Sequence, residues 1–205
     1  MNQLFQIHPN NPQQRLISKV ISYLNKGGVI VYPTASGYAL GCRLEEKNAL
    51  DRICRIRQLD NNHNFTLMCR DLSEIAHYSQ VENSAFHLLK KNILGSYTFI
   101  LKATKKVPRR LMNEKHKTIG LRVTSNPVTL ALLEALNNPI MSTSLILPGN
   151  NFTESDPKNI QNNIGTLVDL IIDGGTLGQQ PTTVVDLRNV PVVVREGSGD
   201  PGPFL

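Results

Sequence analysis

Four arginines stand at the ends of predicted helices and strands, where their side chains could converge on an anion. Arg55 and Arg57 close a predicted helix, and Arg122 and Arg195 end two predicted strands. A guanidinium group binds a phosphate or a carboxylate through a two-pronged fork of hydrogen bonds. Three or four such groups around one hollow would clamp a polyanion, as phosphoryl and adenylyl transfer require.

The spacing of Arg55 and Arg57 sets a condition on that clamp. Residues two apart in a helix do not share a face, so both reach one ligand only if the helix unwinds there. The alternative interpretation is a pair of solvated arginines.

Hydroxyl side chains supply the neutral part of the predicted site. Thr34 and Tyr38 follow the β-branched run of residues 29–31, and Ser142 and Ser144 end another predicted strand. Sites in α/β proteins are usually built at the ends of rigid strands. For the first of these stretches, an ordinary strand–turn–strand connection is the alternative interpretation.

The net charge of +6 indicates an anionic partner, such as a phosphate compound or a nucleic acid. Basic residues are densest over residues 102–117, which contain Lys105, Lys106, Arg109 and Arg110. These four residues predict an RNA-binding surface, for which a solvated basic face is the alternative.

The composition is that of a globular domain without a membrane segment. Apolar residues make up 40% of the chain and charged residues 19%, and no apolar run approaches the ~20 residues that cross a bilayer. The N-terminus has no basic segment followed by an apolar one, so no signal peptide is expected.

Three cysteines without zinc or redox spacing indicate reduced thiols in a cytoplasmic protein. The five histidines have no metal-ligand spacing either; His63, in a loop near arginines, is the one of interest, and an exposed loop histidine is the alternative.

Hydrophobic periodicity predicts helices and strands that interleave along the whole chain. The helices are expected over residues 12–26, 45–57, 72–78, 83–92, 126–136 and 157–164, and the strands over 29–31, 38–42, 65–69, 97–101, 118–123, 139–144, 168–172, 182–187 and 191–195. Turn-forming residues predict a loop over 59–64. Pro33 is expected to stop the first strand, because proline has no N–H to give to a ladder. The pattern predicts one α/β (α+β) domain over residues 1–205, built on a mixed sheet.

Eight short segments, in this order, resemble the YrdC-like family of threonylcarbamoyl-AMP synthases, and within it the YciO branch. The segments are VYPTASGYALGC, RICRIRQ, HNFTLMCRDL, GSYTFILK, TIGLRV, STSLILPG, DGG followed by TTVVDL, and VVREG. Each is weak alone, but their order covers essentially the whole chain. The resemblance implies the YrdC-like fold, a large twisted mixed sheet with helices packed on it and a positively charged cleft.

The resemblance also implies a reaction. Threonine and bicarbonate give N-carboxy-threonine, whose carboxylate attacks the α-phosphate of ATP and releases pyrophosphate. The product, threonylcarbamoyl-AMP, serves the formation of threonylcarbamoyladenosine in tRNA through separate proteins. The expected partners are therefore ATP with transiently bound Mg²⁺, L-threonine, bicarbonate, tRNA or double-stranded RNA, and tRNA-modification proteins.

The family's motifs imply roles for individual residues of this chain. The expected threonine contacts are Thr34, Tyr38, Arg122, Ser142 and Thr182; the expected nucleotide contacts are Arg55, Arg57, Asn64, Thr118, Ser144 and Arg195. Arg55 and Arg57 match the family's Lys-x-Arg pair, and the resemblance implies a catalytic role for both.

Four positions depart from the family pattern. Arg55 replaces a lysine, Ile146 replaces the asparagine of a Ser-x-Asn motif, Ala35 replaces an aspartate, and Cys69 stands where a ligand-contacting histidine is common. Each lost polar contact costs about 1–3 kcal/mol of binding. Two hypotheses follow: a synthase with weakened or altered activity, and a protein of the same fold that binds double-stranded RNA or tRNA without synthase turnover.

Overall fold

One mixed sheet runs through the whole molecule. The computed structural model describes residues 3–60 and 63–205, and within them eleven strands form this sheet. The strands are β1 (Gln3–Gln6), β2 (Ile30–Thr34), β3 (Gly37–Cys42), β4 (Thr66–Cys69), β5 (Ser79–Gln80), β6 (Tyr97–Ala103), β7 (Thr118–Val123), β8 (Ile140–Ser144), β9 (Leu170–Asp173), β10 (Thr183–Asp186) and β11 (Val192–Arg195). Their order is β1-β9-β2-β3-β8-β4-β7-β6-β10-β11, with β5 paired to β6 at one side. The mixed sheet expected from the sequence is confirmed.

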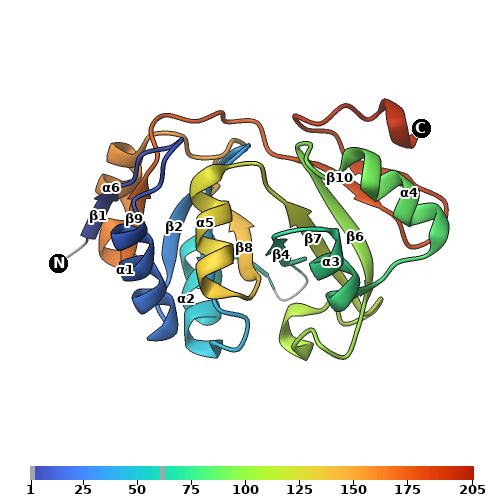
Figure 1. The fold of residues 1–205 in the computed structure, drawn as a ribbon, viewed down its shortest axis with the longest axis horizontal. Coiled ribbons are helices and arrows are strands. Elements are labelled where there is room, and N and C mark those ends of the chain that lie inside the picture. Colours follow the sequence, from blue (N-terminus) through green and yellow to red (C-terminus); the bar gives the residue numbers. More distant parts are fainter. Residues whose placement is uncertain (1–2, 61–62) are drawn as a thin grey trace.

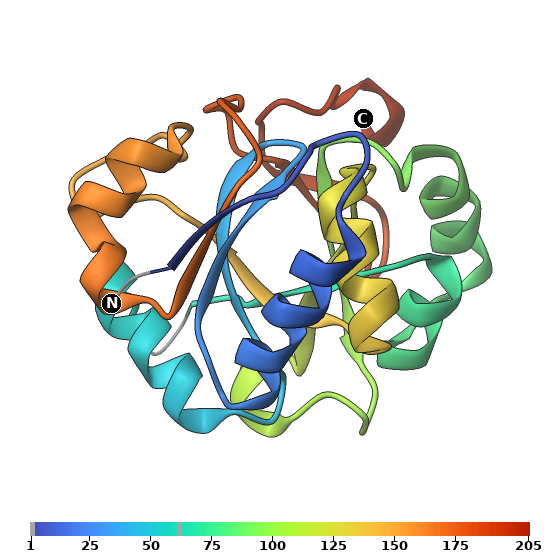
Figure 2. The same ribbon diagram turned by 60° about the vertical axis from the view of Figure 1, so that its left-hand side comes forward.

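Six α-helices pack on this sheet. They are α1 (Gln14–Asn25), α2 (Lys47–Arg57), α3 (Leu72–Tyr78), α4 (Asn83–Asn92), α5 (Pro127–Leu136) and α6 (Pro157–Ile164). Three of them begin at a side-chain cap, because Asp71, Asn126 and Asp156 each accept a hydrogen bond from a backbone N–H of the first turn. Figure 1 shows α1 and α5 side by side in front of β2, and Figure 2 shows α2 and α6 on the opposite side of the strands from α1 and α5.

The buried side chains divide into two clusters, one on each face of the sheet. One cluster contains Ile17 of α1 and Leu132 of α5 together with Tyr32 and Met68 of the strands. The other contains residues of α2, α3, α4 and α6, with Leu67 of β4 among the strand residues. Met68 and Leu67 are adjacent in β4 and serve opposite clusters, as the alternation of side chains along a strand requires.

The β2–β3 hairpin corrects one expectation about Pro33. The strand does not stop there but continues to Thr34, and Pro33 pairs with Tyr38 of β3. The ladder between β2 and β9 ends at Val31, so at Pro33 no neighbouring strand requires an N–H on that side. The carbonyl of Pro33 accepts a hydrogen bond from the hydroxyl of Thr129, which ties α5 to the strand.

The remaining differences from the sequence-based assignment are small. Strands β1 and β5 were not expected, because Gln3–Gln6 and Ser79–Gln80 are short and largely polar. Residues 61 and 62 of the predicted loop over 59–64, and residues 1 and 2 of the N-terminal segment, lie outside the described residues. In the part of the chain that the structure describes, every helix is too short or too polar to span a membrane.

The packing of α2 gives a first testable prediction, because this helix carries Arg57. Ile53 is fully buried on the inner face of α2, and Ile53→Ala should lower the free energy of unfolding by about 2–5 kcal/mol. Val190 is 80% exposed, so the control Val190→Ala should change it by no more than about 0.5 kcal/mol. Urea unfolding followed by circular dichroism measures both. Equal effects of the two variants would contradict the assigned packing.

Candidate functional site

A cavity of about 280 Å³ lies where β4, β6, β7, β8, β10 and β11 meet the end of α2. It is lined by Arg57, His63, Asn64, Thr66, Thr98, Ile100, Gly120, Thr143, Ser144, Ile146, Thr182, Val184, Val194 and Arg195. On β6, Thr98 and Ile100 face the cavity while Phe99 between them is in the core. This alternation explains how strands with many apolar residues also place polar side chains along the cavity.

Gly120 lines the cavity at a position where the neighbouring strand approaches closely. It pairs with Thr66 of β4 and with Ile100 of β6, two other lining residues. A Cβ atom at this position would lie 2.7 Å from Thr66 Oγ1 and 3.0 Å from the carbonyl oxygen of Phe65. A side chain at this position would therefore clash with β4, which favours glycine there.

Arg57 is the last residue of α2 and points into the cavity. One terminal nitrogen donates a hydrogen bond to the carbonyl oxygen of Ile146, while Nε is buried and has no partner within the described residues. Burial lowers the pKa of Arg57 to about 10, so the guanidinium remains charged at neutral pH. The cavity thus contains a cation with a free donor.

Arg55 does not join Arg57, which corrects the expectation that both hold one ligand. Helix α2 stays wound through Arg57, and two residues turn the helix by about 200°. Arg55 instead donates to the carbonyl oxygen of Asp51 and lines a separate shallow groove with Arg52 and Leu167. The condition for convergence, an unwound helix end, is not met.

His63 and Asn64 enter the cavity from the loop that follows α2. The Nε2 atom of His63 lies 3.3 Å from Thr143 Oγ1, and its ring packs edge-on against Phe65 with the centroids 5.2 Å apart. Burial, and after it the charge of Arg57, lowers the pKa of His63. Asn64 accepts a hydrogen bond from the side-chain amide of Asn113. His63 is therefore part of the site rather than an exposed loop histidine.

Arg195 and Thr182 close the cavity on the side of β10 and β11. The Nε and Nη2 atoms of Arg195 lie 3.3 Å and 2.8 Å from the carbonyl oxygen of Thr182 and donate to it. The hydroxyls of Thr182 and Thr98 are 2.8 Å apart and share a hydrogen bond. Burial lowers the pKa of Arg195. These contacts hold a second cation opposite Arg57.

Arg122 is a buried cation that forms no ion pair with any described residue. It is two residues after Gly120 in β7, so its side chain leaves the same face of the sheet as the cavity floor, and it is 5% exposed. Its Nε and Nη2 atoms are buried with no hydrogen-bond partner, and the ion pairs of the described residues do not include it. Burial lowers its pKa to about 10, which still leaves it charged at neutral pH.

Ser142 and Tyr32 accompany Arg122 in this buried region. The hydroxyl of Tyr32 donates to Ser142 Oγ over 2.5 Å. Burial raises the pKa of Tyr32 to about 12, although the positive charge of Arg122 acts to lower it. Tyr32 is therefore a neutral phenol at physiological pH and does not balance the charge of Arg122.

Thr34 and Tyr38 use their hydroxyls within the chain. Thr34 Oγ1 donates to the carbonyl of Gly37 and accepts from the N–H of Ser36, which fastens the β2–β3 turn. Tyr38 donates to the carbonyl of Gly175 over 2.7 Å and accepts from the N–H of Gly174 over 3.1 Å. Neither residue lines the cavity, and Thr118, buried at the start of β7, does not line it either.

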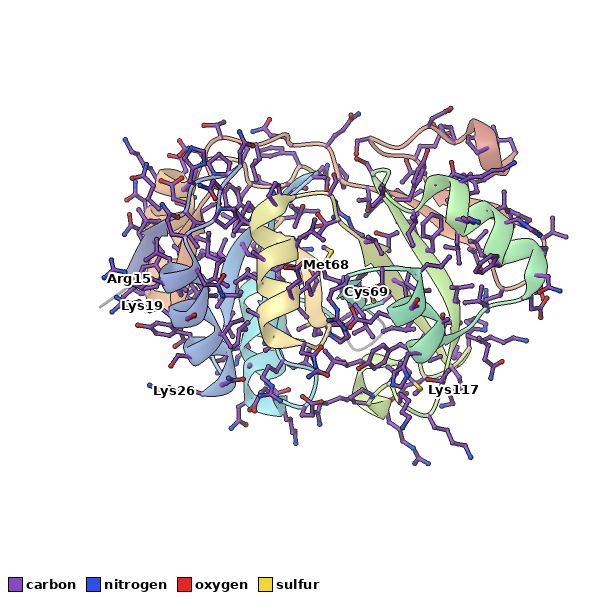
Figure 3. The ribbon with its side chains drawn as sticks, in the orientation of Figure 1. Arg15, Lys19, Lys26, Met68, Cys69 and Lys117 are labelled. Carbon is purple, nitrogen blue, oxygen red and sulfur yellow. The ribbon has the colours of Figure 1, made fainter. Side chains whose placement is uncertain are left out.

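The predicted RNA-binding residues lie at a second, wider groove of about 870 Å³. Lys105 and Arg109 line it together with Lys117 and Glu114; Lys106 is exposed nearby, and Arg110 donates to the carbonyl of Leu44. Figure 3 shows Lys117 at the lower right of the molecule, away from Arg15 and Lys19 on α1 and from Lys26, which follows α1.

Sequence reasoning thus found some cavity residues and missed others. The structure brings together Arg57, Asn64, Ser144, Thr182 and Arg195 at the cavity, with Arg122 and Ser142 beside it. The sequence analysis missed Thr66 and Thr98. Both alternate with core residues along β4 and β6, and this alternation could have indicated that they face away from the core. Within residues 3–60 and 63–205, there is no group of three or more His, Cys, Asp or Glu side chains that could hold a metal ion.

Comparison with known proteins places this geometry in a family. The profile of the Sua5/yciO/yrdC family, described as "Telomere recombination", matches residues 22–197. The Escherichia coli K12 protein named "Uncharacterized protein YciO" is 66% identical over 206 residues, covering 100% of both chains, and the E. coli YciO crystal structure superposes with a TM-score of 0.98 over 100% of both chains. A threonylcarbamoyl-AMP synthase from Chromobacterium violaceum is 34% identical over 66% of this chain and 70% of its own.

A more distant structure shares the fold alone. P. abyssi Sua5 complexed with L-threonine is 22% identical, with a TM-score of 0.86 over 95% of this chain and 57% of that chain. The profile match spans most of the chain, and the similarity to E. coli YciO extends over all of it. The chain belongs to the Sua5/YciO/YrdC family.

Proposed function

We propose that this protein binds ATP and an amino acid in the cavity and forms an acyl-adenylate, threonylcarbamoyl-AMP, from L-threonine, bicarbonate and ATP. The observation that carries the proposal is the buried guanidinium of Arg122, two nitrogens of which have no hydrogen-bond partner among the described residues. Taking a charge out of water costs several kcal/mol unless a partner compensates it. An amino acid carboxylate is a matching partner, because it accepts two parallel hydrogen bonds from one guanidinium.

The two arginines that line the cavity, Arg57 and Arg195, suit the phosphates of ATP. Arg57 has a free, buried Nε, and Arg195 is fixed by the carbonyl of Thr182. Charge-assisted hydrogen bonds from such groups are stronger in a partly dry cavity than in water. Asn64 and Ser144, which also line the cavity, add neutral donors. A cavity of about 280 Å³ is at the lower end of ligand pockets, so part of the nucleotide would lie outside it.

In this proposal the chain positions its substrates and neutralises charge. Threonine reacts with bicarbonate to give N-carboxy-threonine and water, and an oxygen of the new carboxylate attacks the α-phosphorus of ATP. The bond to the bridging oxygen breaks, and pyrophosphate leaves with that electron pair. Arg122 would fix the amino acid carboxylate, while Arg57 and Arg195 would offset the negative charge of the phosphates. Magnesium enters with ATP as part of the substrate.

Two relatives support the choice of substrates. The C. violaceum protein is named a threonylcarbamoyl-AMP synthase, and the P. abyssi Sua5 structure contains L-threonine on a similar fold. Several positions of this chain differ from the family pattern, and these differences argue for slower turnover than in a protein that has the full pattern. Ile146 presents an apolar side chain to the cavity, Cys69 is fully buried, and Ala35 is exposed on the β2–β3 turn.

A second candidate function is the binding of double-stranded RNA or tRNA, which the wide basic groove favours. Three cations, Lys105, Arg109 and Lys117, surround it. Double-stranded RNA is recognised mainly through its shape and its phosphates, which needs cations more than aromatic residues. This function is compatible with the first, because the groove and the cavity are lined by different residues.

The two arginines at the end of α2 give a matched pair of variants for ATP binding. Arg57→Ala should raise the dissociation constant for Mg–ATP about 10- to 100-fold, because it removes a charge-assisted contact of about 1.5–3 kcal/mol. Arg55→Ala should leave it within about twofold, since Arg55 faces another groove. Isothermal titration calorimetry measures both constants. Loss of binding in Arg55→Ala alone would overturn the assignment of the phosphate site.

Arg122→Met separates a ligand-binding role from a structural one. Without ligand, this variant should melt at the same temperature as the wild type or higher, because replacing a buried unpaired charge with an apolar residue is neutral or stabilising. Threonine at ~100 times its wild-type dissociation constant should stabilise the wild type by about 2.7 kcal/mol and leave the variant unchanged. The control Arg15→Met, on the exposed side of α1, should respond to threonine like the wild type. Differential scanning calorimetry gives these values, and a full threonine response in Arg122→Met would refute the carboxylate assignment.

Salt dependence tests the RNA-binding groove. Replacing Lys105, Arg109 and Lys117 with alanine should weaken binding to a double-stranded RNA and reduce the slope of log K against log[salt] by about 2. The control replaces Arg15 and Lys19 of α1 and Lys26, which follows α1, with alanine, which removes the same charge from a distant surface (Figure 3). Fluorescence anisotropy over a salt series measures the slopes. If the two triple variants bind RNA equally, the groove is not the RNA site.

A further inference from the structure

We propose that His63 is a phosphate-binding residue of the cavity that takes up a proton when a phosphate group binds beside Arg57. The inference rests on the proposed function, because it needs a phosphate in the cavity. It goes beyond that function by adding a ligand contact and by making the affinity for the nucleotide depend on pH.

The placement of His63 carries the first step. It lines the cavity with Arg57 and Asn64, and its ring is held on two sides. Phe65 contacts the ring edge-on, and Thr143 Oγ1 lies 3.3 Å from Nε2. A side chain fixed in this way presents the same donor to each ligand that enters, and an imidazolium donates hydrogen bonds from both nitrogens.

The charges around His63 keep the imidazole neutral in the free protein. Arg57 from α2 opposes a second positive charge, and burial acts in the same direction and more strongly. Asp60, on the loop, acts the other way and is the weakest of the three influences. From β8 the ring meets the neutral hydroxyl of Thr143, while Arg195 on β11 adds a further cation to the cavity wall. The net result is a pKa of His63 below its usual value.

A bound phosphate reverses this balance. A dianion between Arg57 and His63 neutralises the repulsion between them, and it favours an imidazolium that can donate a hydrogen bond to it. The proton comes from solvent and ends on the imidazole, and no covalent bond is made or broken. Because ligand binding raises the pKa of His63, the gain in affinity is fully present below the pKa of the free protein. It is lost as the pH rises through the pKa of the complex.

The test uses inorganic sulfate, a dianion whose own charge does not change near neutral pH. Its dissociation constant for the wild type should rise about tenfold from about pH 6 to about pH 8, which corresponds to a shift of about one unit in the pKa of His63. His63→Gln should change by less than about twofold over this range. His63→Lys carries a permanent charge and should bind at about pH 8 as the wild type does at about pH 6. His87→Gln, on the exposed side of α4, is the control and should behave like the wild type.

Proton NMR of the histidine rings gives a second, direct reading. The His63 resonance, identified by its absence in His63→Gln, should titrate below about pH 6.5 in the free protein and about one unit higher with Mg–ATP. If Mg–ATP binds but the His63 midpoint does not move, the inference fails while the proposed function stands. If neither sulfate nor Mg–ATP perturbs the wild-type spectrum, the proposed phosphate site and this inference both fail.

Discussion

The charge of Arg122 is the feature on which the interpretation of this molecule depends. A guanidinium that is 5% exposed, with two nitrogens unpaired in the part of the chain that the structure describes, is costly for the free protein. Tyr32 is protonated and bonded to Ser142, so it does not relieve that cost. A protein that needed only stability at this position would be served as well by an apolar side chain. The arrangement is understandable if an anion supplied from outside completes it.

The sheet explains why Arg122 shares a face of β7 with Gly120, which lines the cavity of the other two cations. Strand alternation sends Gly120 and Arg122 to one face of β7, while Leu121 between them anchors the strand in the opposite core. Arg57 arrives at the end of α2, and Arg195 at the end of β11. Arg57 and Arg122 are therefore carried by elements with buried apolar side chains, and hydrophobic packing distant from the site helps to orient them. Strand β11 is mostly exposed, and Arg195 is held instead by the carbonyl of Thr182.

The sequence predicted the elements better than the side-chain directions. The helix positions follow from apolar spacing and from caps such as Asn126, and these are local properties of the chain. The prediction that the strand stops at Pro33 was wrong for a non-local reason. A proline is acceptable there because the ladder between β2 and β9 has already ended at Val31. The separation of Arg55 from Arg57 was foreseeable from helical geometry, but whether α2 unwound at its end was not. The hydroxyl of Thr34 bonds locally, to Ser36 and Gly37 of the same turn. The hydroxyl of Tyr38 bonds to Gly174 and Gly175, which are distant in the sequence and which no local pattern reveals.

A crystal structure of the protein with L-threonine and a non-hydrolysable Mg–ATP analogue would test the central claim most directly. The account predicts a threonine carboxylate oxygen within about 2.7–2.9 Å of Arg122 Nε or Nη2, with the nucleotide phosphates against Arg57. An Arg122 side chain that stays unpaired while both ligands bind elsewhere would contradict it.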